Sequence, residues 1–324
     1  MNTAENNSLK RKKIKLSSLT IYIGLLALIV VFAVVCQMNG KNFLTWNNIS
    51  NILVQSSIIA IVAIGASLVI LTGGIDLSTG AVVGLIGMAS ALMIKNGMSI
   101  PMACILGLLC GCGFGLISGL GISYGKVPPF IMTLGMQGIA SGMTLAISGG
   151  KPVSGFPMEL SDIANTTIAG IPIFIVYVAI LYVVMVFVMS KTRAGRYIYA
   201  IGGNRNAARL SGVNTNGMEA FTYIIAGLFS AIGGILLLSR LSYASTTAGN
   251  GYELDAIAAA VIGGISLSGG QGKLINTLFG ALIMGVLKAG LQILDVSTYF
   301  QQIAIGAIII ICVFLDKSKE RKAE

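Results

Sequence analysis

Apolar runs long enough to cross a lipid bilayer occupy most of this 324-residue sequence, and they constrain its fold more than any other feature. A membrane-spanning helix needs about 20 mostly apolar residues, and fewer where other helices surround it. Only 10% of the residues are charged, against about 25% in a typical soluble domain, so the chain cannot cover a globular surface with charge. The sequence therefore predicts an all-α integral membrane protein.

About ten segments qualify as transmembrane helices by length and composition. They lie near residues 17–37, 51–72, 77–94, 100–123, 130–148, 171–190, 218–239, 253–267, 274–290 and 299–315. The first one follows a basic cluster at Lys10–Lys15, as in a signal peptide. Its apolar run, Leu16–Cys36, is too long for a signal-peptide core and no small-residue cleavage site follows it. We interpret it as an uncleaved span.

The distribution of Lys and Arg predicts the orientation, because cytoplasmic loops of membrane proteins are enriched in these residues. The asymmetry is greatest with ten spans and both termini in the cytoplasm. The expected organisation is a basic tail (1–16), a transmembrane domain (17–316) and a C-terminal tail (317–324). The few basic residues expected outside are Lys41, Lys95, Lys151, Arg240 and Lys288.

One polar interruption, the central loop at residues 191–217, carries several basic residues and no acidic one, which predicts a cytoplasmic location. Its second half has helix signals, with Asn204 as an N-cap and Gly212 as a stop after Asn206–Leu210. A helix of about two turns is not stable alone in water. We therefore hypothesise that it rests on another protein, a cytoplasmic motor subunit.

Two further patterns lie near the ends of spans. Leu267–Gln271 spells the signature sequence of ATP-binding cassettes, but no phosphate-binding Gly-x4-Gly-Lys-Ser/Thr loop accompanies it. We interpret it as a tight turn and expect no ATP binding by this chain. Gly73–Ser78 recurs in similar form as Gly263–Ser268, which suggests broken helices meeting inside the membrane, with chance recurrence as the alternative.

Composition argues against several other functions. The sequence has no histidine, which removes histidine-based proton relays, metal ligands and catalytic triads. Its five cysteines lie in apolar runs, and we interpret Cys110 and Cys112 as buried apolar residues. We therefore expect no metal, no cofactor and no catalytic centre. We also expect no nucleic-acid partner, because the basic residues behind the net charge of +10 lie where membrane topology requires them.

Asn206–Gly212 resembles the Glu-Ala-Ala-x3-Gly pattern of the cytoplasmic loop in permease subunits of ABC importers. Asn206 stands where that pattern has an acid, and the Ile-x-Leu-Pro tail is missing. The ordered segments TRAGRYIYAIGGN, ARLSGVN, TAGNGYELDAIAAAVIGG and LTGGIDLS extend the resemblance over nearly the whole chain. Together they are similar to the monosaccharide branch of these permeases, and most similar to its ribose-type members.

The resemblance implies a multi-pass protein of the bacterial cytoplasmic membrane that moves a monosaccharide, ribose in particular. It also implies a homodimer or heterodimer of ten-span subunits, a separate ATPase that binds the ATP, and an extracytoplasmic sugar-binding protein. The central loop would couple to the ATPase, with small Ala side chains seated in a groove. The residues implied are Arg193, Gly195, Arg196, Gly202, Asn204, Asn206, Ala207, Ala208, Arg209 and Gly212.

Polar residues in or beside the spans are candidates for the translocation path and for partner contact. Asp76 follows two glycines and could line the path, but an N-cap of the next helix is the favoured reading. Glu253 and Asp255 open a span, where they suit the helix dipole or could contact the binding protein. Gln55, Gln137 and Asn276 could hydrogen-bond a sugar, or simply join helices.

An ion-coupled secondary sugar transporter and a channel are the competing interpretations. Coupled carriers place acidic residues in the middle of spans, whereas here the acids cluster at span ends. A channel with an uncharged pore leaves little trace in a sequence. Loss of transport without ATP, and its persistence without an ion gradient, would distinguish the importer from the coupled carrier.

Overall fold

The computed structural model describes the backbone of residues 3–321 and the side chains of residues 20–311 and of Phe314. The side chains of both predicted tails and of Cys312 lie outside this described part. The fold is mostly helical, with four two-residue strands. The helices are α1 (Thr3–Met38), α2 (Trp46–Leu71), α3 (Thr79–Lys95), α4 (Ile100–Ser123), α5 (Pro129–Ser148), α6 (Met158–Asn165), α7 (Ile173–Lys191), α8 (Arg193–Gly203), α9 (Arg205–Leu210), α10 (Thr215–Leu241), α11 (Tyr252–Ile262), α12 (Leu274–Ile293) and α13 (Thr298–Arg321).

Seven helices among the described residues are long and apolar enough to cross a membrane. They are the Thr20–Met38 part of α1 and helices α2, α4, α5, α7, α10 and α12. Two shorter apolar helices are α3 and the Thr298–Ile311 part of α13. The remaining expected span corresponds to α11, whose 11 residues reach only about 16 Å, roughly half of a bilayer core. The predicted helical membrane fold is confirmed, whereas a count of ten full spans is not.

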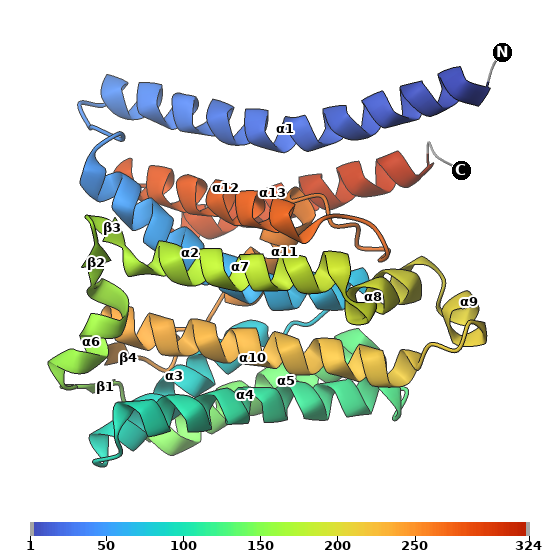
Figure 1. Cartoon of the computed structure of the whole chain (residues 1–324). Helices are drawn as coiled ribbons and strands as arrows, with labels where there is room; N and C mark the ends of the chain where they lie inside the picture. The colour runs from blue at the N-terminus through green and yellow to red at the C-terminus, as the bar shows by residue number, and fades with distance from the viewer. Residues whose placement is uncertain (1–2, 322–324) are drawn as a thin grey trace.

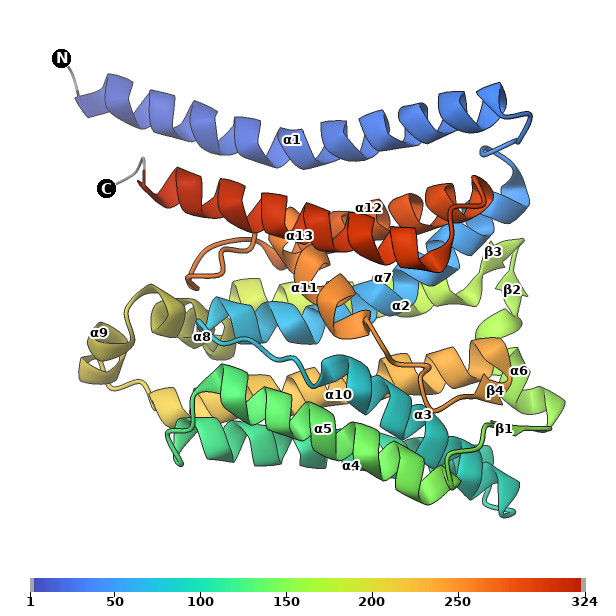
Figure 2. The same cartoon turned by 180° about the vertical axis from the view of Figure 1, so that it is seen from behind.

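The axes of most long helices are roughly aligned, parallel or antiparallel to one another, and the two ends of the bundle differ (Figure 1). One end carries α8, α9 and both chain termini, as seen from both sides (Figures 1 and 2). The other end carries α6 and the strands β1 (Val153–Ser154), β2 (Thr167–Ile168), β3 (Ile171–Pro172) and β4 (Tyr243–Ala244), paired antiparallel as β1–β4 and β2–β3. The termini and the central loop therefore share one end of the molecule.

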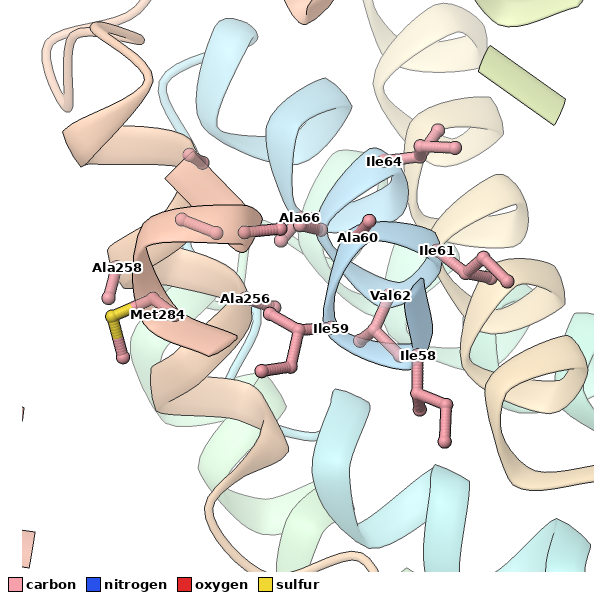
Figure 3. Packing of buried hydrophobic residues seen from close by; sticks show 14 of the residues in the cluster. Ile58, Ile59, Ala60, Ile61, Val62, Ile64, Ala66, Ala256, Ala258 and Met284 are labelled. Atoms are coloured by element: carbon pink, nitrogen blue, oxygen red, sulfur yellow. The ribbon is translucent and has the colours of Figure 1, made fainter. Parts of the chain in front are cut away.

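Helix α2 forms the centre of the bundle because its second half is apolar on every side. Every residue from Ser56 to Leu71 is buried, and α2 contacts α7, α10, α11 and α12. Figure 3 shows Ile59 and Ala66 of α2 on the side of Ala256 of α11, with Met284 of α12 nearby, whereas Ile58 points away from them. The helices around the centre of the bundle, including α8, thus pack against one buried helix.

Glycines allow α4 and α10 to approach closely. A Cβ atom on Gly111 would lie 2.6 Å from the carbonyl oxygen of Gly227, and one on Gly119 would lie 2.7 Å from that of Ala220. Side chains larger than hydrogen would separate the two backbones at these points. These glycines therefore serve close helix packing.

Two irregular segments enter the bundle and lead into the short helices α3 and α11. Residues 72–78 connect α2 to α3, and residues 242–251 connect α10 to α11 (Figure 2). The segments bring Gly249 against the first turns of α3, since a Cβ on Gly249 would lie 2.6 Å from the backbone nitrogen of Gly84. The repeated Gly-Gly motifs flank these short helices, one before α3 and the other after α11.

Candidate functional site

The first half of the central loop forms a helix, α8, that sequence analysis missed. The hydroxyl of Thr192 caps it by accepting a hydrogen bond from the Gly195 backbone nitrogen at 3.5 Å. Gly195, Ile198 and Ile201 are buried against the rest of the chain. A capping threonine followed by small or apolar residues every third position is the signal that could have identified this amphipathic helix.

The second half forms the predicted short helix, α9. The side-chain oxygen of Asn204 accepts a hydrogen bond from the Ala207 backbone nitrogen at 2.9 Å, which confirms the predicted N-cap. Gly212 has a φ of +84°, a left-handed conformation that glycine adopts without strain, and the helix has ended just before it. Local sequence signals therefore determine both ends of α9.

The two alanines of α9 point in different directions, which corrects the expectation that both seat in a partner's groove. Ala208 is buried, with 5% of its surface exposed, and it packs against its own chain. Ala207 is exposed, and Leu210 is 90% exposed at the tip of the helix. Leu210 is therefore the large apolar side chain that α9 exposes to solvent.

A salt bridge that sequence analysis also missed holds α9 to the start of α10. The guanidinium of Arg205 donates two hydrogen bonds of 2.7 Å to the carboxylate of Glu219, and a third of 3.1 Å to Asn216. The Glu219 side chain is only 8% exposed, so it requires this partner. The hydrogen bond to Glu219 raises the pKa of Arg205. No local pattern connects residues this far apart in the sequence.

We define the exposed face of the central loop as six of the solvent-exposed residues of α8 and α9. They are Arg193, Arg196, Asn206, Ala207, Arg209 and Leu210. Three of these side chains are positively charged and one is a large apolar group. Such a face can attract an acidic surface and insert one apolar anchor into it.

The opposite side of α8 faces the membrane-spanning helices. Gly202 lies against the carbonyl oxygen of Leu71 at the end of α2 and against the backbone nitrogen of Gly270. Gly195 lies against the backbone of Met189 in α7. Gly195 and Gly202 of the central loop therefore permit close backbone contact within this chain.

Asp76 is buried but is not the N-cap of α3, which is a correction to the favoured expectation. The N-cap is Ser78, and one carboxylate oxygen of Asp76 accepts hydrogen bonds from its backbone nitrogen (2.9 Å) and its hydroxyl (2.6 Å). This is a tight turn of the kind that aspartate forms with the residue two positions later. Asp76 thus shapes the entry into α3.

Glu253 and Asp255 occupy the first turn of α11, as predicted, but they have different surroundings. Asp255 is 2% exposed and pairs with Lys288 of α12. Asp255 therefore has no surface from which to contact an external protein, and Lys288 lies inside α12 instead of in the expected outer loop. One carboxylate oxygen of Glu253 is buried beside Gly80 of α3.

The other candidates for a translocation path lie on separate helices. Gln55 is on α2, Gln137 on α5 and Asn276 on α12, and Asn276 is 9% exposed. No hydrogen bond joins these side chains to one another or to Asp76 within the described part of the chain. Across residues 20–311 there is also no group of three or more metal-ligating side chains.

Leu267–Gln271 forms the tight turn predicted for it. The backbone nitrogen of Gly269 donates to the carbonyl oxygen of Ser266 at 3.1 Å, and that of Ser266 donates to the carbonyl oxygen of Gln271, also at 3.1 Å. Gly269 and Gly270 have φ values of +85° and +68°. Positive φ at consecutive positions explains the pair of glycines without any nucleotide chemistry.

Comparison with known proteins gives a consistent set of relatives. A family profile described as branched-chain amino acid transport system / permease component matches residues 48–313. The ribose import permease protein RbsC of Escherichia coli (strain K12) is 41% identical over 301 residues, covering 92% of this chain and 94% of that protein. RbsC of Bacillus subtilis (strain 168) is 40% identical over 92% of both chains. The galactose/methyl galactoside import permease protein MglC of E. coli (strain K12) is 38% identical over 91% of this chain and 94% of its own. No solved structure matches the chain.

Proposed function

This chain belongs to the branched-chain amino acid transport system / permease component family, and from that premise we propose that it is the permease subunit of an ATP-driven sugar importer. Its proposed substrate is a monosaccharide, ribose. The observation that carries this proposal is the identity of 40% or more with ribose import permeases of two different bacteria over 92% of the chain. Allose and galactose import permeases are relatives at 37% and 38% identity.

As a permease subunit in the bacterial cytoplasmic membrane, the chain requires partners that supply energy and substrate. We propose that a cytoplasmic cassette ATPase binds the exposed face of the central loop, with Leu210 as its apolar anchor. The exposed arginines Arg193, Arg196 and Arg209 of this face favour an acidic surface on that ATPase. A sugar-binding protein would deliver substrate at the opposite end, near α6, and a second permease subunit would complete the path.

Within the membrane domain we propose a path that Gln55, Gln137 and Asn276 line with uncharged hydrogen-bonding groups. Such groups can bind sugar hydroxyls without the desolvation cost of a charge. Glu253 is the acidic residue of α11 that is available to a partner or a substrate, because Asp255 is already paired with Lys288.

Uptake of radiolabelled ribose tests the function. The chain is expressed in cells that lack ribose import, together with a cassette ATPase and a sugar-binding protein from its own genome. Uptake should require all three proteins and intact ATP, and it should persist when an ionophore collapses the ion gradients. Uptake that stops with the ionophore and needs no ATPase would support an ion-coupled carrier instead.

Thiol labelling tests the orientation, with both termini and the central loop in the cytoplasm. In a variant without the five natural cysteines, a cysteine replacing Asn206 should resist a membrane-impermeant reagent in intact cells. A cysteine replacing Met158, which is 84% exposed in α6, should react. The reverse pattern would contradict the proposed topology.

A further inference from the structure

Three segments far apart in the sequence meet at one point under the central loop. They are the last turn of α8, the residues that follow α2, and the segment 263–273 between α11 and α12. The backbone nitrogen of Gly270 donates a hydrogen bond of 3.0 Å to the carbonyl oxygen of Leu71. Gly202 of α8 lies against both of these atoms. We call Leu71, Gly202, Gly269 and Gly270 the glycine junction.

The backbones at this junction are in direct contact, with no side chain between them. A Cβ atom on Gly202 would overlap the Leu71 carbonyl oxygen and the Gly270 nitrogen. One on Gly269 would lie 3.0 Å from the Gly73 nitrogen and 3.1 Å from the Gly202 Cα. Closely packed backbone has no flexible side chain that could absorb a displacement. A shift of α8 must therefore move the other two segments.

A hydrogen bond provides a second connection between α8 and the segment 263–273. The hydroxyl of Tyr199 donates to the carbonyl oxygen of Gly272 at 3.0 Å. Gly272 has a φ of +120° and packs against the backbone of Ile265. The link thus reaches the same segment from one turn further back along α8.

Both segments at the junction adjoin the short helices inside the bundle. The residues after Leu71 continue into α3, and the segment 263–273 is the continuation of α11. Helices α3 and α11 also contact each other, and the segment before α11 contacts α3 through Gly249, whose backbone lies against Gly80 and Gly84. The chain therefore forms a closed circuit of backbone contacts from α8 through α3 and α11 and back to α8.

We propose that the glycine junction transmits movement of the central loop to α3 and α11 together, and that Gly202 and Tyr199 are its positioning residues. The inference rests on the proposed function, since it needs an ATPase that moves the loop. It assigns to the buried side of α8 a role separate from binding that ATPase. Coupling between ATP hydrolysis and transport should fail when the junction is changed, even though the ATPase stays bound.

The test compares Gly202→Ala with Gly203→Ala in the complete complex with ATPase and sugar-binding protein in lipid vesicles. A Cβ on Gly203 meets nothing within 4 Å, so this variant is a matched control in the same helix. We expect Gly202→Ala to retain the ATPase on purification and to lose about tenfold in sugar transported per ATP hydrolysed. Gly203→Ala should match the wild type in both measurements.

Two results for Gly202→Ala would overturn the inference while leaving the proposed function intact. One is wild-type sugar transport per ATP. The other is a loss of bound ATPase that accounts for all of the lost uptake, because the junction would then act only on binding. Failure of the wild-type chain to bind any cassette ATPase would instead contradict the proposed function.

Tyr199→Phe decides the question if Gly202→Ala does not accumulate in the membrane. It removes one hydrogen bond and adds no atom, and Tyr197→Phe in the same helix is its control. We expect Tyr199→Phe to lower sugar transported per ATP several-fold with the ATPase still bound, and Tyr197→Phe to have no effect. Equal transport per ATP in both variants would overturn the inference.

Discussion

Helices α8 and α9 are neighbours in one loop, yet they differ in what covers them. Helix α8 buries Gly195, Ile198 and Ile201 and contacts the ends of membrane helices. Helix α9 buries only Ala208 and leaves Leu210 90% exposed. The proposal gives the two surfaces of the loop different tasks, because α9 exposes an apolar side chain while the buried side of α8 packs against the chain itself. Changes at Leu210 should therefore affect binding, and changes on the buried side of α8 should affect coupling.

The largest effect on binding is expected from Leu210→Asp. An apolar anchor at the centre of an interface contributes at least about 2 kcal/mol, or about thirtyfold in affinity, and a buried unpaired carboxylate adds a further cost. Because Leu210 packs against nothing in this chain, its replacement should not disturb the fold. We expect the variant to reach the membrane and to lose the ATPase on purification.

Met158→Asp is the matched control for that variant. Met158 is 84% exposed on α6, at the opposite end of the bundle (Figure 1). The ATPase should be recovered with Met158→Asp as with the wild type. Equal recovery with Leu210→Asp would mean that α9 is not the binding surface.

A somewhat smaller effect is expected from Arg205→Ala, which leaves the buried Glu219 carboxylate without its partner. Removing one member of a buried pair costs about 3–5 kcal/mol, and the 39% exposure of Arg205 reduces this to about 1–3 kcal/mol. Helix α9 should detach from α10 and bind the ATPase more weakly. The thermal midpoint of the purified chain measures the loss of stability, and the recovery of the ATPase measures the weaker binding. The double variant Arg205→Ala/Glu219→Gln should restore part of the stability. An unchanged midpoint in the single variant would contradict a structural role for the pair.

Asn204→Ala should weaken α9 by about 1 kcal/mol, because it removes the N-cap hydrogen bond to Ala207. Asn204→Asp keeps a capping oxygen and serves as the control. Hydrogen exchange of the α9 amides should be faster in the alanine variant only. Equal exchange in both variants would show that the cap contributes nothing to the stability of α9.

The smallest effect is expected from Arg209→Ala at the edge of the exposed face. A charge at the rim of an interface changes the association rate and its salt dependence more than the affinity. We expect slower association with the ATPase at low salt and near wild-type association at high salt. A loss of affinity as large as that of Leu210→Asp would mean that Arg209 lies at the centre of the interface and not at its rim.

The same comparison explains which parts of the structure the sequence could predict. Helix α9 was predictable because Asn204 and Gly212 act within a few residues of each other. The position of α8 against the membrane helices was not predictable, because it depends on contacts with Leu71 and Gly270, which are distant from α8 in the sequence. The sequence predicted that the small side chain of Ala208 would be buried in a contact. Only the fold shows that the contact is with its own chain and not with a partner.

Inside the membrane domain, the limits of sequence analysis have the same origin. Lys288 was expected in an outer loop because a lone lysine at the end of an apolar run is typical of one. Its partner, Asp255, lies on another helix, and their pairing stabilises the buried Asp255 and the half-buried Lys288. The shortness of α11 was hidden as well, because the apolar run continues through the turn that follows Ile262.

Photo-cross-linking from position 210 tests the central claim most directly. A photoreactive amino acid replaces Leu210 in one variant and Met158 in a second, and each is illuminated in membranes that contain the whole transport complex. The account predicts a covalent adduct with the cassette ATPase from position 210 and none from position 158. An actively transporting complex that gives no ATPase adduct from position 210 would contradict it.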